Sequence, residues 1–400
     1  MKASAEQIEL GNLLFYDKIL SGNEDISCAT CHHALMATGD GLSLSTGVGG
    51  HGLATARAMG AGRERVPRNA PEIFNRGHAF FTSMFWDSRI ARDEDDPTGF
   101  AQPAGSDLPL GFEHPLEVQA MFPLTSDAEM RGNPGENEIA NAGSNPAIWD
   151  GLEARVMAIP EYQELIAAAY PGVPAEDIGC EHIARAIAAF EADAWRSDDS
   201  PFDRYLRGNR DAMSASAKRG ALLFYGRAGC GDCHSGVFQT DLEHYAIAMP
   251  QLGPGKGQGA DGDEDLGRGP ISGDSADDFK FRTPPLRNVA LTGPYGHSGA
   301  YRTLEGVVRH HLNPVRSLRD WDRSQVLLSV SDDPEDLFSV MDDPAKVQAI
   351  AKANELGRVR LTKWQFDDLM AFLHALTDPA MLDLRSEVPL RVPSGLPLAD

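Results

Sequence analysis

The sequence predicts a mainly α-helical chain with long irregular loops, built as two related halves. Apolar residues recur at helical spacing in several segments, whereas the alternating pattern typical of strands is sparse. Glycine and proline are frequent in four long stretches, which we expect to be loops, at 39–63, 97–115, 131–146 and 250–275. A short block of residues also occurs twice along the chain, which is typical of a duplicated unit.

The first helix is expected to begin at a capping box and to end near Tyr16. In this arrangement Ser4 and Gln7 would satisfy each other's backbone amides. Apolar residues follow at Ile8, Leu10, Leu13 and Leu14. A helix of the same kind begins near Ser214 or Ser216 and runs through Leu222, Leu223 and Phe224.

Periodicity indicates two further helices. One carries apolar residues at Cys180, Ile183, Ala184, Ile187 and Phe190. The other lies behind a second capping box, formed by Thr362 and Gln365, and carries Phe366, Leu369, Leu373 and Leu376. The glycines of 250–275 fit a surface loop better than a phosphate cradle, because no strand leads into them and no Gly-Lys-Ser/Thr follows.

The duplicated block divides the chain. It reads Gly-Asn-Leu-Leu-Phe-Tyr at 11–16 and Gly-Ala-Leu-Leu-Phe-Tyr at 220–225, and each copy precedes a Cys-x-x-Cys-His sequence. We therefore expect one site in each half. The boundary is placed near Ser197–Pro201, giving one domain over 1–197 and another over 198–400.

Composition excludes some functions. The 400 residues are 42% hydrophobic, which is enough to bury a core in each of two domains. The formal net charge of −23 disfavours nucleic acid as a partner, because phosphate binding needs clustered Lys and Arg. No run of apolar residues is long enough to span a membrane. The acidic charge suits either a basic protein partner or simply a well-solvated surface.

Two pairs of cysteines carry the chemistry. The sequences Cys28-Ala29-Thr30-Cys31-His32 and Cys230-Gly231-Asp232-Cys233-His234 are signatures of c-type haem attachment. Two thiols three residues apart can bond the two vinyl groups of one porphyrin, and the adjacent imidazole then becomes the proximal ligand of the iron. The alternatives are a zinc site built from both pairs and a thioredoxin-like redox pair, neither of which requires the histidine.

The fifth cysteine, Cys180, lies in an apolar helical pattern and is expected to be a buried, inert thiol. No signal peptide is visible at Met1. Because c-type haem is normally attached outside the bacterial cytoplasm, we expect a periplasmic protein in its mature form, with the export signal removed.

With these motifs in place, the chain resembles the bacterial di-haem cytochrome c peroxidases and their relative MauG, which oxidises residues of a partner protein. The resemblance runs from about Leu10 to Leu376, with insertions. Besides the two haem signatures and the block before the first, its motifs lie at 67–71 (Pro-Arg-Asn-Ala-Pro), 85–89 (Phe-Trp-Asp-Ser-Arg), 201–206 (Pro-Phe-Asp-Arg-Tyr-Leu) and 282–292 (Arg-Thr-Pro-Pro-Leu-Arg-Asn-Val-Ala-Leu-Thr).

The resemblance implies two cytochrome c-like domains, each holding one covalent haem. The N-terminal haem is then the peroxide site, and the C-terminal haem is where electrons enter. Trp86 matches the tryptophan that lies between the haems in the family, although a Phe-Trp pair is also ordinary core packing. A Ca²⁺ ion between the domains would be bound by Asn69, Thr292 and Pro294, which supply oxygen ligands of the kind that calcium prefers.

The resemblance also implies an acid/base group above the first haem. Gln119, Pro123 and Glu129 fall in the family's pattern, with Glu129 as the carboxylate that moves protons on hydrogen peroxide. Read without the family, Glu129 is an ordinary acidic residue in an acidic loop beside Asp127.

Two histidines depart from the pattern. A loop histidine caps the resting peroxide haem in some members, and His51 is the nearest candidate here, although its loop is longer and an ordinary loop histidine fits as well. At the second haem, His311 stands where the peroxidases usually carry Met and MauG carries Tyr. The neighbouring His310 would point roughly 100° away on a helix. A second imidazole in place of a thioether would lower the potential of that haem.

These residues predict a peroxide-dependent di-haem oxidoreductase, which has two possible electron sources. One is a small cytochrome or cupredoxin, and the other is a Trp or Tyr side chain of a partner protein, as for MauG. The change from Met to His at 311 favours the second source. A non-enzymatic di-haem electron carrier is the remaining alternative, and Glu129 argues against it because a carrier needs no acid above an open iron.

Overall fold

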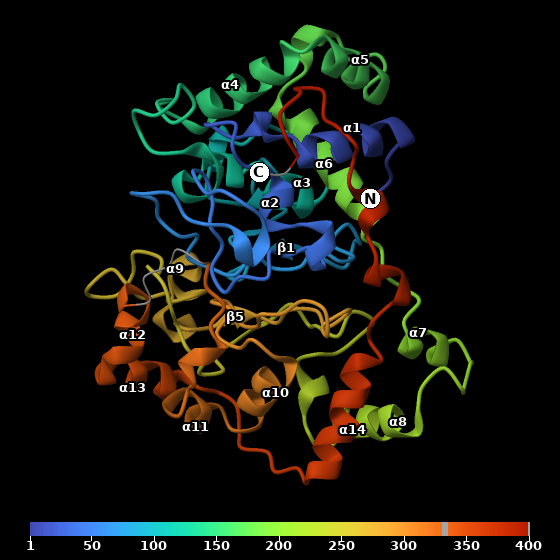
Figure 1. Ribbon diagram of the computed structural model, residues 1–400, viewed down its shortest axis with the longest axis vertical. Helices are drawn as coiled ribbons and strands as arrows, with labels where there is room; N and C mark the ends of the chain where they lie inside the picture. The colour runs from blue at the N-terminus through green and yellow to red at the C-terminus, as the bar shows by residue number, and fades with distance from the viewer. Residues whose placement is uncertain (330–334, 399–400) are drawn as a thin grey trace.

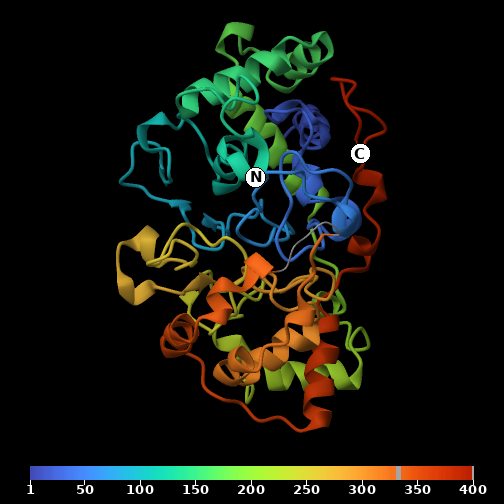
Figure 2. The same ribbon diagram turned by 60° about the vertical axis from the view of Figure 1, so that its left-hand side comes forward.

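The computed structural model describes residues 1–329 and 335–398, and the chain forms two mainly helical halves stacked one on the other (Figure 1). The turned view separates the same two halves (Figure 2). This confirms the predicted fold class. Within the described residues, no helix combines the length and the apolar character that crossing a bilayer requires.

The first half is framed by α1, which packs against α6. Its capping box of Ser4 and Gln7 is formed as predicted. Antiparallel pairing joins three short strands in the order β1-β2-β3. The elements of this half are α1 (Ala5–Tyr16), α2 (Cys28–Cys31), β1 (Ser83–Met84), β2 (Ile90–Arg92), β3 (Phe100–Ala101), α3 (Pro115–Gln119), α4 (Asn145–Met157), α5 (Pro160–Ala169) and α6 (Cys180–Ala194).

The second half repeats the frame with α8 packed against α14. The capping box of Thr362 and Gln365 is formed here too, as predicted. Its elements are α7 (Pro201–Leu206), α8 (Ala215–Phe224), β4 (His244–Tyr245), α9 (Gly269–Ser272), β5 (Phe281–Arg282), α10 (Leu304–Leu312), α11 (Pro314–Arg319), α12 (Ser339–Asp342), α13 (Pro344–Ala353) and α14 (Lys363–His374). The four stretches predicted as loops are largely irregular, with short elements such as β3 and α9 in them.

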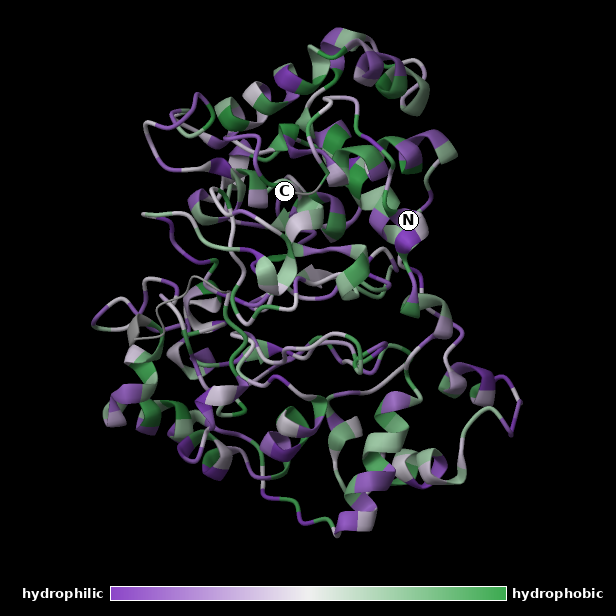
Figure 3. Cartoon of the chain, in the orientation of Figure 1, coloured by the Kyte–Doolittle hydropathy of each residue, from purple (hydrophilic) through white to green (hydrophobic). Residues whose placement is uncertain are grey.

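The duplicated block has a steric explanation. A Cβ on Gly11 would lie 1.8 Å from the Ala186 carbonyl oxygen, and one on Gly220 would lie 1.9 Å from that of Asp368. Both glycines therefore allow two helix backbones to cross closely, α1 over α6 and α8 over α14. Leu14 and Phe15 after the first glycine and Phe224 after the second are buried beside the crossings, whereas Leu222 is exposed. Figure 3 shows hydrophobic green turns next to hydrophilic purple ones in this part of the first half.

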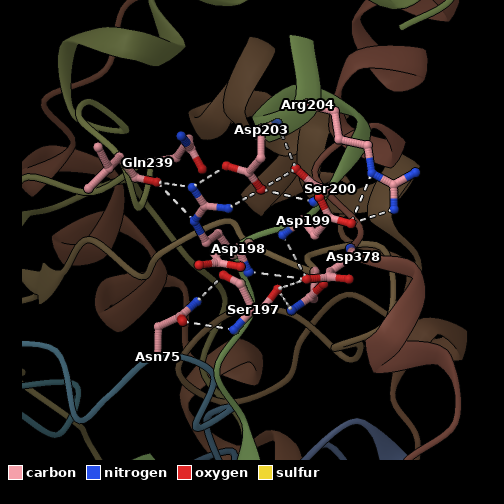
Figure 4. A network of polar contacts seen from close by, with 12 residues as sticks. Asn75, Ser197, Asp198, Asp199, Ser200, Asp203, Arg204, Gln239 and Asp378 are labelled. Carbon is pink, nitrogen blue, oxygen red and sulfur yellow. Dashed lines mark hydrogen bonds and ion pairs between the residues drawn. The ribbon is translucent and has the colours of Figure 1, made fainter. Parts of the chain in front are cut away.

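The linker between the halves is held by a polar network (Figure 4). Asn75 of the first half exchanges two hydrogen bonds with the backbone of Ser197, each 2.9 Å long. The Asp378 carboxylate of the second half accepts from the backbone amides of Asp198 (3.1 Å) and Asp199 (2.9 Å) and from the Ser197 hydroxyl (3.3 Å). The segment at the expected boundary is thus fixed to both halves.

After α14 the chain returns to the first half, which the sequence did not indicate. Met381, Leu384 and Val392 pack into the first core. The Ser394 hydroxyl donates to Asp17 at 2.7 Å, and the Asn12 amide donates to the Glu387 carbonyl at 2.7 Å. The tail therefore crosses the boundary drawn at 197/198, and Figure 1 shows it in red beside α1 and α6.

A buried ion-pair cluster joins the halves directly. The Arg68 guanidinium binds both carboxylate oxygens of Asp265, at 2.6 and 2.8 Å, and donates to Asp87 at 2.6 Å. All three side chains are buried. Burial opposes ionisation of Asp87, but Arg68 and Arg89 outweigh it and lower the Asp87 pKa to about 2. Asp265 comes from the second half, so this contact ties 250–275 to the first.

We predict that Arg68→Met lowers the free energy of unfolding by about 3–5 kcal/mol, because it leaves the buried Asp265 carboxylate without its cation and Asp87 with Arg89 alone. Urea unfolding at neutral pH measures this change. The exposed pair Arg196–Asp198 provides the control, since Arg196→Met should cost no more than about 1 kcal/mol. An Arg68→Met variant as stable as the control variant would contradict the role given to Arg68.

Candidate functional site

In the described part of the chain, each half has a cavity that contains one Cys-x-x-Cys-His sequence. Cys28, Cys31 and His32 line the first. Cys230, Cys233 and His234 line the second. Because the two cysteine pairs open into different cavities, they do not meet as one zinc site. All four thiols are free.

The histidines of the two Cys-x-x-Cys-His sequences, His32 and His234, make the same kind of hydrogen bond. Nδ1 of His32 donates to the Thr38 carbonyl at 3.0 Å, and Nδ1 of His234 donates to the Gln239 carbonyl at 3.0 Å. Burial lowers the pKa of both imidazoles, that of His234 to about 4, so both are neutral at pH 7. A neutral ring whose Nδ1 carries the proton presents Nε2 as the free metal ligand, which suits a haem iron.

His311 faces His234 across the second cavity. Its Nδ1 donates to the Val307 carbonyl at 2.8 Å within α10, which again leaves Nε2 free. The centres of the two imidazole rings are 6.3 Å apart. A metal–imidazole bond is roughly 2.0–2.1 Å long, and the centre of the imidazole ring lies roughly 1.1 Å beyond the bonded nitrogen. Two imidazoles bonded to one metal ion from opposite sides therefore have ring centres about 6.3 Å apart. The residues present therefore fit an iron held by two histidines.

His310 cannot serve in this way. It is fully buried, its Nε2 donates to the Ile247 carbonyl at 2.8 Å, and its Nδ1 accepts from the Tyr301 hydroxyl at 2.8 Å. Burial lowers its pKa to about 3, so the ring is neutral and both nitrogens are already used. The hydrogen bonds thus favour His311 over His310 as a ligand.

The first cavity is different, since His32 is the one histidine among the described residues that line it. Gln119, Pro123 and Glu129 all line the same cavity. Glu129 lies in a single π-helical turn, Asp127–Arg131, an irregularity that is frequent at functional sites. Burial raises the pKa of Glu129, and the charges of Arg89 and Lys256 oppose that rise. The sequence-predicted acid/base residues are thus gathered beside one free proximal histidine.

A thin wall separates the cavities. Trp86 lines both, and its indole Nε1 donates to the Asn69 carbonyl at 3.0 Å. Arg282 lines both cavities as well, and its Nε donates to the Phe85 carbonyl at 3.0 Å. The full set of residues shared by the two cavities is Asn69, Pro71, Glu72, Trp86 and Arg282. Residues 69–86 of the first half therefore form most of the wall.

The other residues singled out in the sequence are the three calcium candidates, His51 and Cys180. Asn69, Thr292 and Pro294 all line the second cavity, and Asn69 donates through its amide nitrogen to the Leu42 carbonyl at 2.8 Å. No group of three His, Cys, Asp or Glu side chains arranged for a metal occurs in the described part of the chain, so calcium here would depend on amide and carbonyl oxygens. His51 is exposed and lines neither cavity. Cys180 is buried, as expected.

Sequence reasoning missed Lys256, which lines the first cavity although it belongs to the second half. It lies in 250–275, predicted as a surface loop. The one available signal was that Lys256 is the only lysine in that acidic, glycine-rich stretch. Arg89 is the last residue of the 85–89 motif, to which the resemblance assigns no role at this position, and it too lines the first cavity.

Known proteins resemble the chain over most of its length. The family model for di-haem cytochrome c peroxidase matches residues 5–211. The methylamine utilization protein MauG of Methylorubrum extorquens is 32% identical over 309 residues, which are 77% of this chain and 69% of that protein. The cytochrome c551 peroxidase of Pseudomonas aeruginosa is 32% identical over 305 residues, 76% of this chain and 71% of that one.

Solved structures agree. A MauG-like protein associated with microbial copper homeostasis superposes with a TM-score of 0.65 and 28% identity, covering 97% of this chain and 93% of its own. The diheme peroxidase BthA from Burkholderia thailandensis gives a TM-score of 0.64 over 95% of this chain and 88% of its own, and its 19% identity speaks for the fold alone.

The histidine geometry generates a spectroscopic prediction. We expect His311→Ala to convert a low-spin haem signal into a high-spin one, because it removes the second strong ligand, and His310→Ala to preserve the low-spin signal. Electron paramagnetic resonance of the ferric protein measures both. A low-spin signal that survives His311→Ala would place the ligand elsewhere.

Proposed function

Since this chain belongs to the di-haem cytochrome c peroxidase family and is an oxidoreductase of that type, we propose that it reduces hydrogen peroxide in the first cavity with electrons that enter through the second. The observation that carries the proposal is the asymmetry of the cavities. Glu129 and Gln119 accompany a single histidine in the first, whereas two histidines face each other in the second.

The family implies two c-type haems, and the residues of both cavities fit them. His32 would hold one haem and His234 with His311 the other, with thioether bonds from Cys28, Cys31, Cys230 and Cys233. When bound, the first haem supplies an open iron at which peroxide is reduced. The overall reaction takes up two electrons and two protons and converts H₂O₂ into two molecules of water.

Glu129 does the proton work in this proposal. As a carboxylate it takes the proton from one peroxide oxygen and returns it to the other oxygen, which leaves as water. Its raised pKa makes it a better base than an exposed glutamate and a ready acid afterwards. Gln119 orients the peroxide or a water molecule by hydrogen bonding, and Pro123 shapes the wall of the cavity beside it.

Trp86 connects the two sites. Its indole is fixed by the hydrogen bond to the Asn69 carbonyl and touches both cavities, so it offers an aromatic step between them. A Ca²⁺ ion bound by Asn69, Thr292 and Pro294 at the same wall stays a prediction. So does a periplasmic location, which rests on where c-type haem is attached.

The electron source has two candidates. A small cytochrome or cupredoxin would make the protein a peroxidase in the narrow sense. A Trp or Tyr side chain of a partner protein would make it a MauG-like modifying enzyme, and the pairing of His234 with His311 favours this second candidate, because two imidazoles lower the potential at which electrons enter. The net charge of −23 suits a basic partner in either case.

We predict that Glu129→Gln slows the reaction with peroxide on the order of 10²-fold or more, because the general acid/base is lost, while the haem content is unchanged. Stopped-flow absorbance measures the rate. In the wild type the rate should fall as pH drops through the pKa of Glu129, at a pH above the ordinary value of 4.5, because only the carboxylate acts as a base.

Asp127→Asn is the matched control, since this exposed carboxylate lies in the same π-helical turn and pairs with Arg131. Its rate should stay near that of the wild type. An unchanged rate in Glu129→Gln would mean that another group moves the proton.

A further inference from the structure

A loop of the second half delivers a cation to the cavity of the first. Lys256 lines the first cavity together with Arg89 and Glu129, although 250–275 otherwise belongs to the other half. The positive charge of Lys256 therefore acts on this cavity, where the proposed acid/base residue is Glu129.

The backbone around Lys256 is built to hold one position. Gly255 has a φ of +65°, and a Cβ there would lie 2.2 Å from the Asp263 carbonyl oxygen, so only glycine allows the two chain segments to meet. The Lys256 amide then donates to the Glu264 carbonyl at 3.0 Å, and the Glu264 amide donates to the Gln258 carbonyl at 3.1 Å. These contacts close residues 255–264 into a compact turn.

The end of this turn is anchored to the first half. Asp265 follows it directly and receives the buried Arg68 guanidinium through two hydrogen bonds. Gln251 braces Asp265 from the other side, donating to its carbonyl at 2.6 Å and accepting from its amide at 3.0 Å. Lys256 is therefore placed relative to the first cavity by the contact that joins the halves.

Charged side chains of both halves line the first cavity together with Lys256 and Glu129, namely Arg68, Glu72, Arg76, Arg89, Glu191 and Arg282. Arg89, Arg68, Asp87 and Glu129 act on the lysine, and burial lowers its pKa, whereas Arg89 and Lys256 act on the glutamate. Arg89 is already committed, because it pairs with Asp87 at 3.2 Å and lies 3.5 Å from the centre of the Phe85 ring.

Lys256, in contrast to Arg89, is not held in an ion pair with any described residue. Within the described residues its ammonium has no carboxylate at ion-pair distance, and neither does Glu129 have a cation so close. Both groups line the first cavity, and neither is neutralised by a described partner at ion-pair distance.

We propose that Lys256 is a positioning residue of the peroxide cavity, whose positive charge keeps Glu129 a carboxylate and favours small anions, such as hydroperoxide, beside it. This inference rests on the proposed function of the first cavity. It adds that the second half contributes a residue to the reaction site of the first.

The test compares Lys256→Gln and Lys256→Arg with wild type, in the haem-loaded full-length protein. One readout is the pH profile of the peroxide rate. The other, independent of turnover, is the dissociation constant of fluoride in the resting ferric protein, read from the Soret band. Lys256→Gln should move the acidic limb of the profile to higher pH by up to about one unit and weaken fluoride about tenfold.

Lys256→Arg keeps the charge and should restore both values. Lys346→Gln is the matched control, since Lys346 holds the outer side of the same turn through Asp261 (2.8 Å) and Asp263 (2.6 Å) and lines neither cavity. It should leave the limb and the fluoride affinity unchanged. Lys256→Met provides a second neutral variant should Lys256→Gln fail to load haem.

The outcomes separate the two claims. If Glu129→Gln abolishes the rate but Lys256→Gln changes neither the limb nor the fluoride affinity, the inference is wrong and the proposed function stands. If Lys346→Gln reproduces the effects of Lys256→Gln, the position of the loop, and not the charge of Lys256, is responsible, and the inference is also wrong. If Glu129→Gln reacts normally, the proposed function itself fails.

Discussion

The arrangement of this molecule depends on the buried guanidinium of Arg68. It neutralises Asp87 in the first half and Asp265 in the second, with no water-exposed side chain among the three. Without that cation the buried carboxylate of Asp265 would be unpaired, and Asp87 would keep only Arg89. An unpaired buried charge costs several kcal/mol. The residue after Arg68 is Asn69, whose carbonyl fixes Trp86, and the residue after Asp87 is Ser88, whose carbonyl accepts from Arg268 of the second half. One ion cluster thus holds the wall between the cavities and the loop that carries Lys256.

The two halves share a scaffold and differ in chemistry. In each, a glycine permits a close helix crossing, a Cys-x-x-Cys-His sequence follows, and a backbone carbonyl accepts a hydrogen bond from Nδ1–H of the histidine. The difference lies on the opposite side of each cavity. α10 places an imidazole opposite His234, whereas a π-helical turn places the carboxylate of Glu129 beside the first cavity. A site closed by two ligands suits electron transfer, and a site with one ligand and an acid suits chemistry on a bound molecule.

The sequence predicted α1, α6, α8 and α14, because their signals are local. Capping boxes at Ser4 and Thr362 and the apolar spacing from Cys180 to Phe190 depend on neighbours within a few residues, and the structure contains all three helices. The haem signatures are local too. Glu129 came from the family pattern and not from its own surroundings, because an acidic residue in an acidic loop carries no local sign of burial.

Long-range placement could not be predicted. Lys256 reads as part of a surface loop, since nothing in its neighbours indicates that Asp265 is bound by Arg68 almost two hundred residues earlier. The return of the tail, with Val392 in the first core, likewise depends on contacts between distant residues. In the sequence, only the directions of side chains on a helix favoured His311 over His310. The structure adds that both ring nitrogens of His310 are already used, by the Tyr301 hydroxyl and the Ile247 carbonyl.

In the proposed reaction two unlike sites, one open and one closed, communicate through the wall that contains Trp86. Electron paramagnetic resonance of the protein as isolated, followed by addition of one equivalent of H₂O₂, tests it most directly. We expect one high-spin and one low-spin ferric signal before peroxide, and loss of intensity from both afterwards. Two low-spin signals that peroxide leaves unchanged would contradict an open first site and identify the protein as an electron carrier.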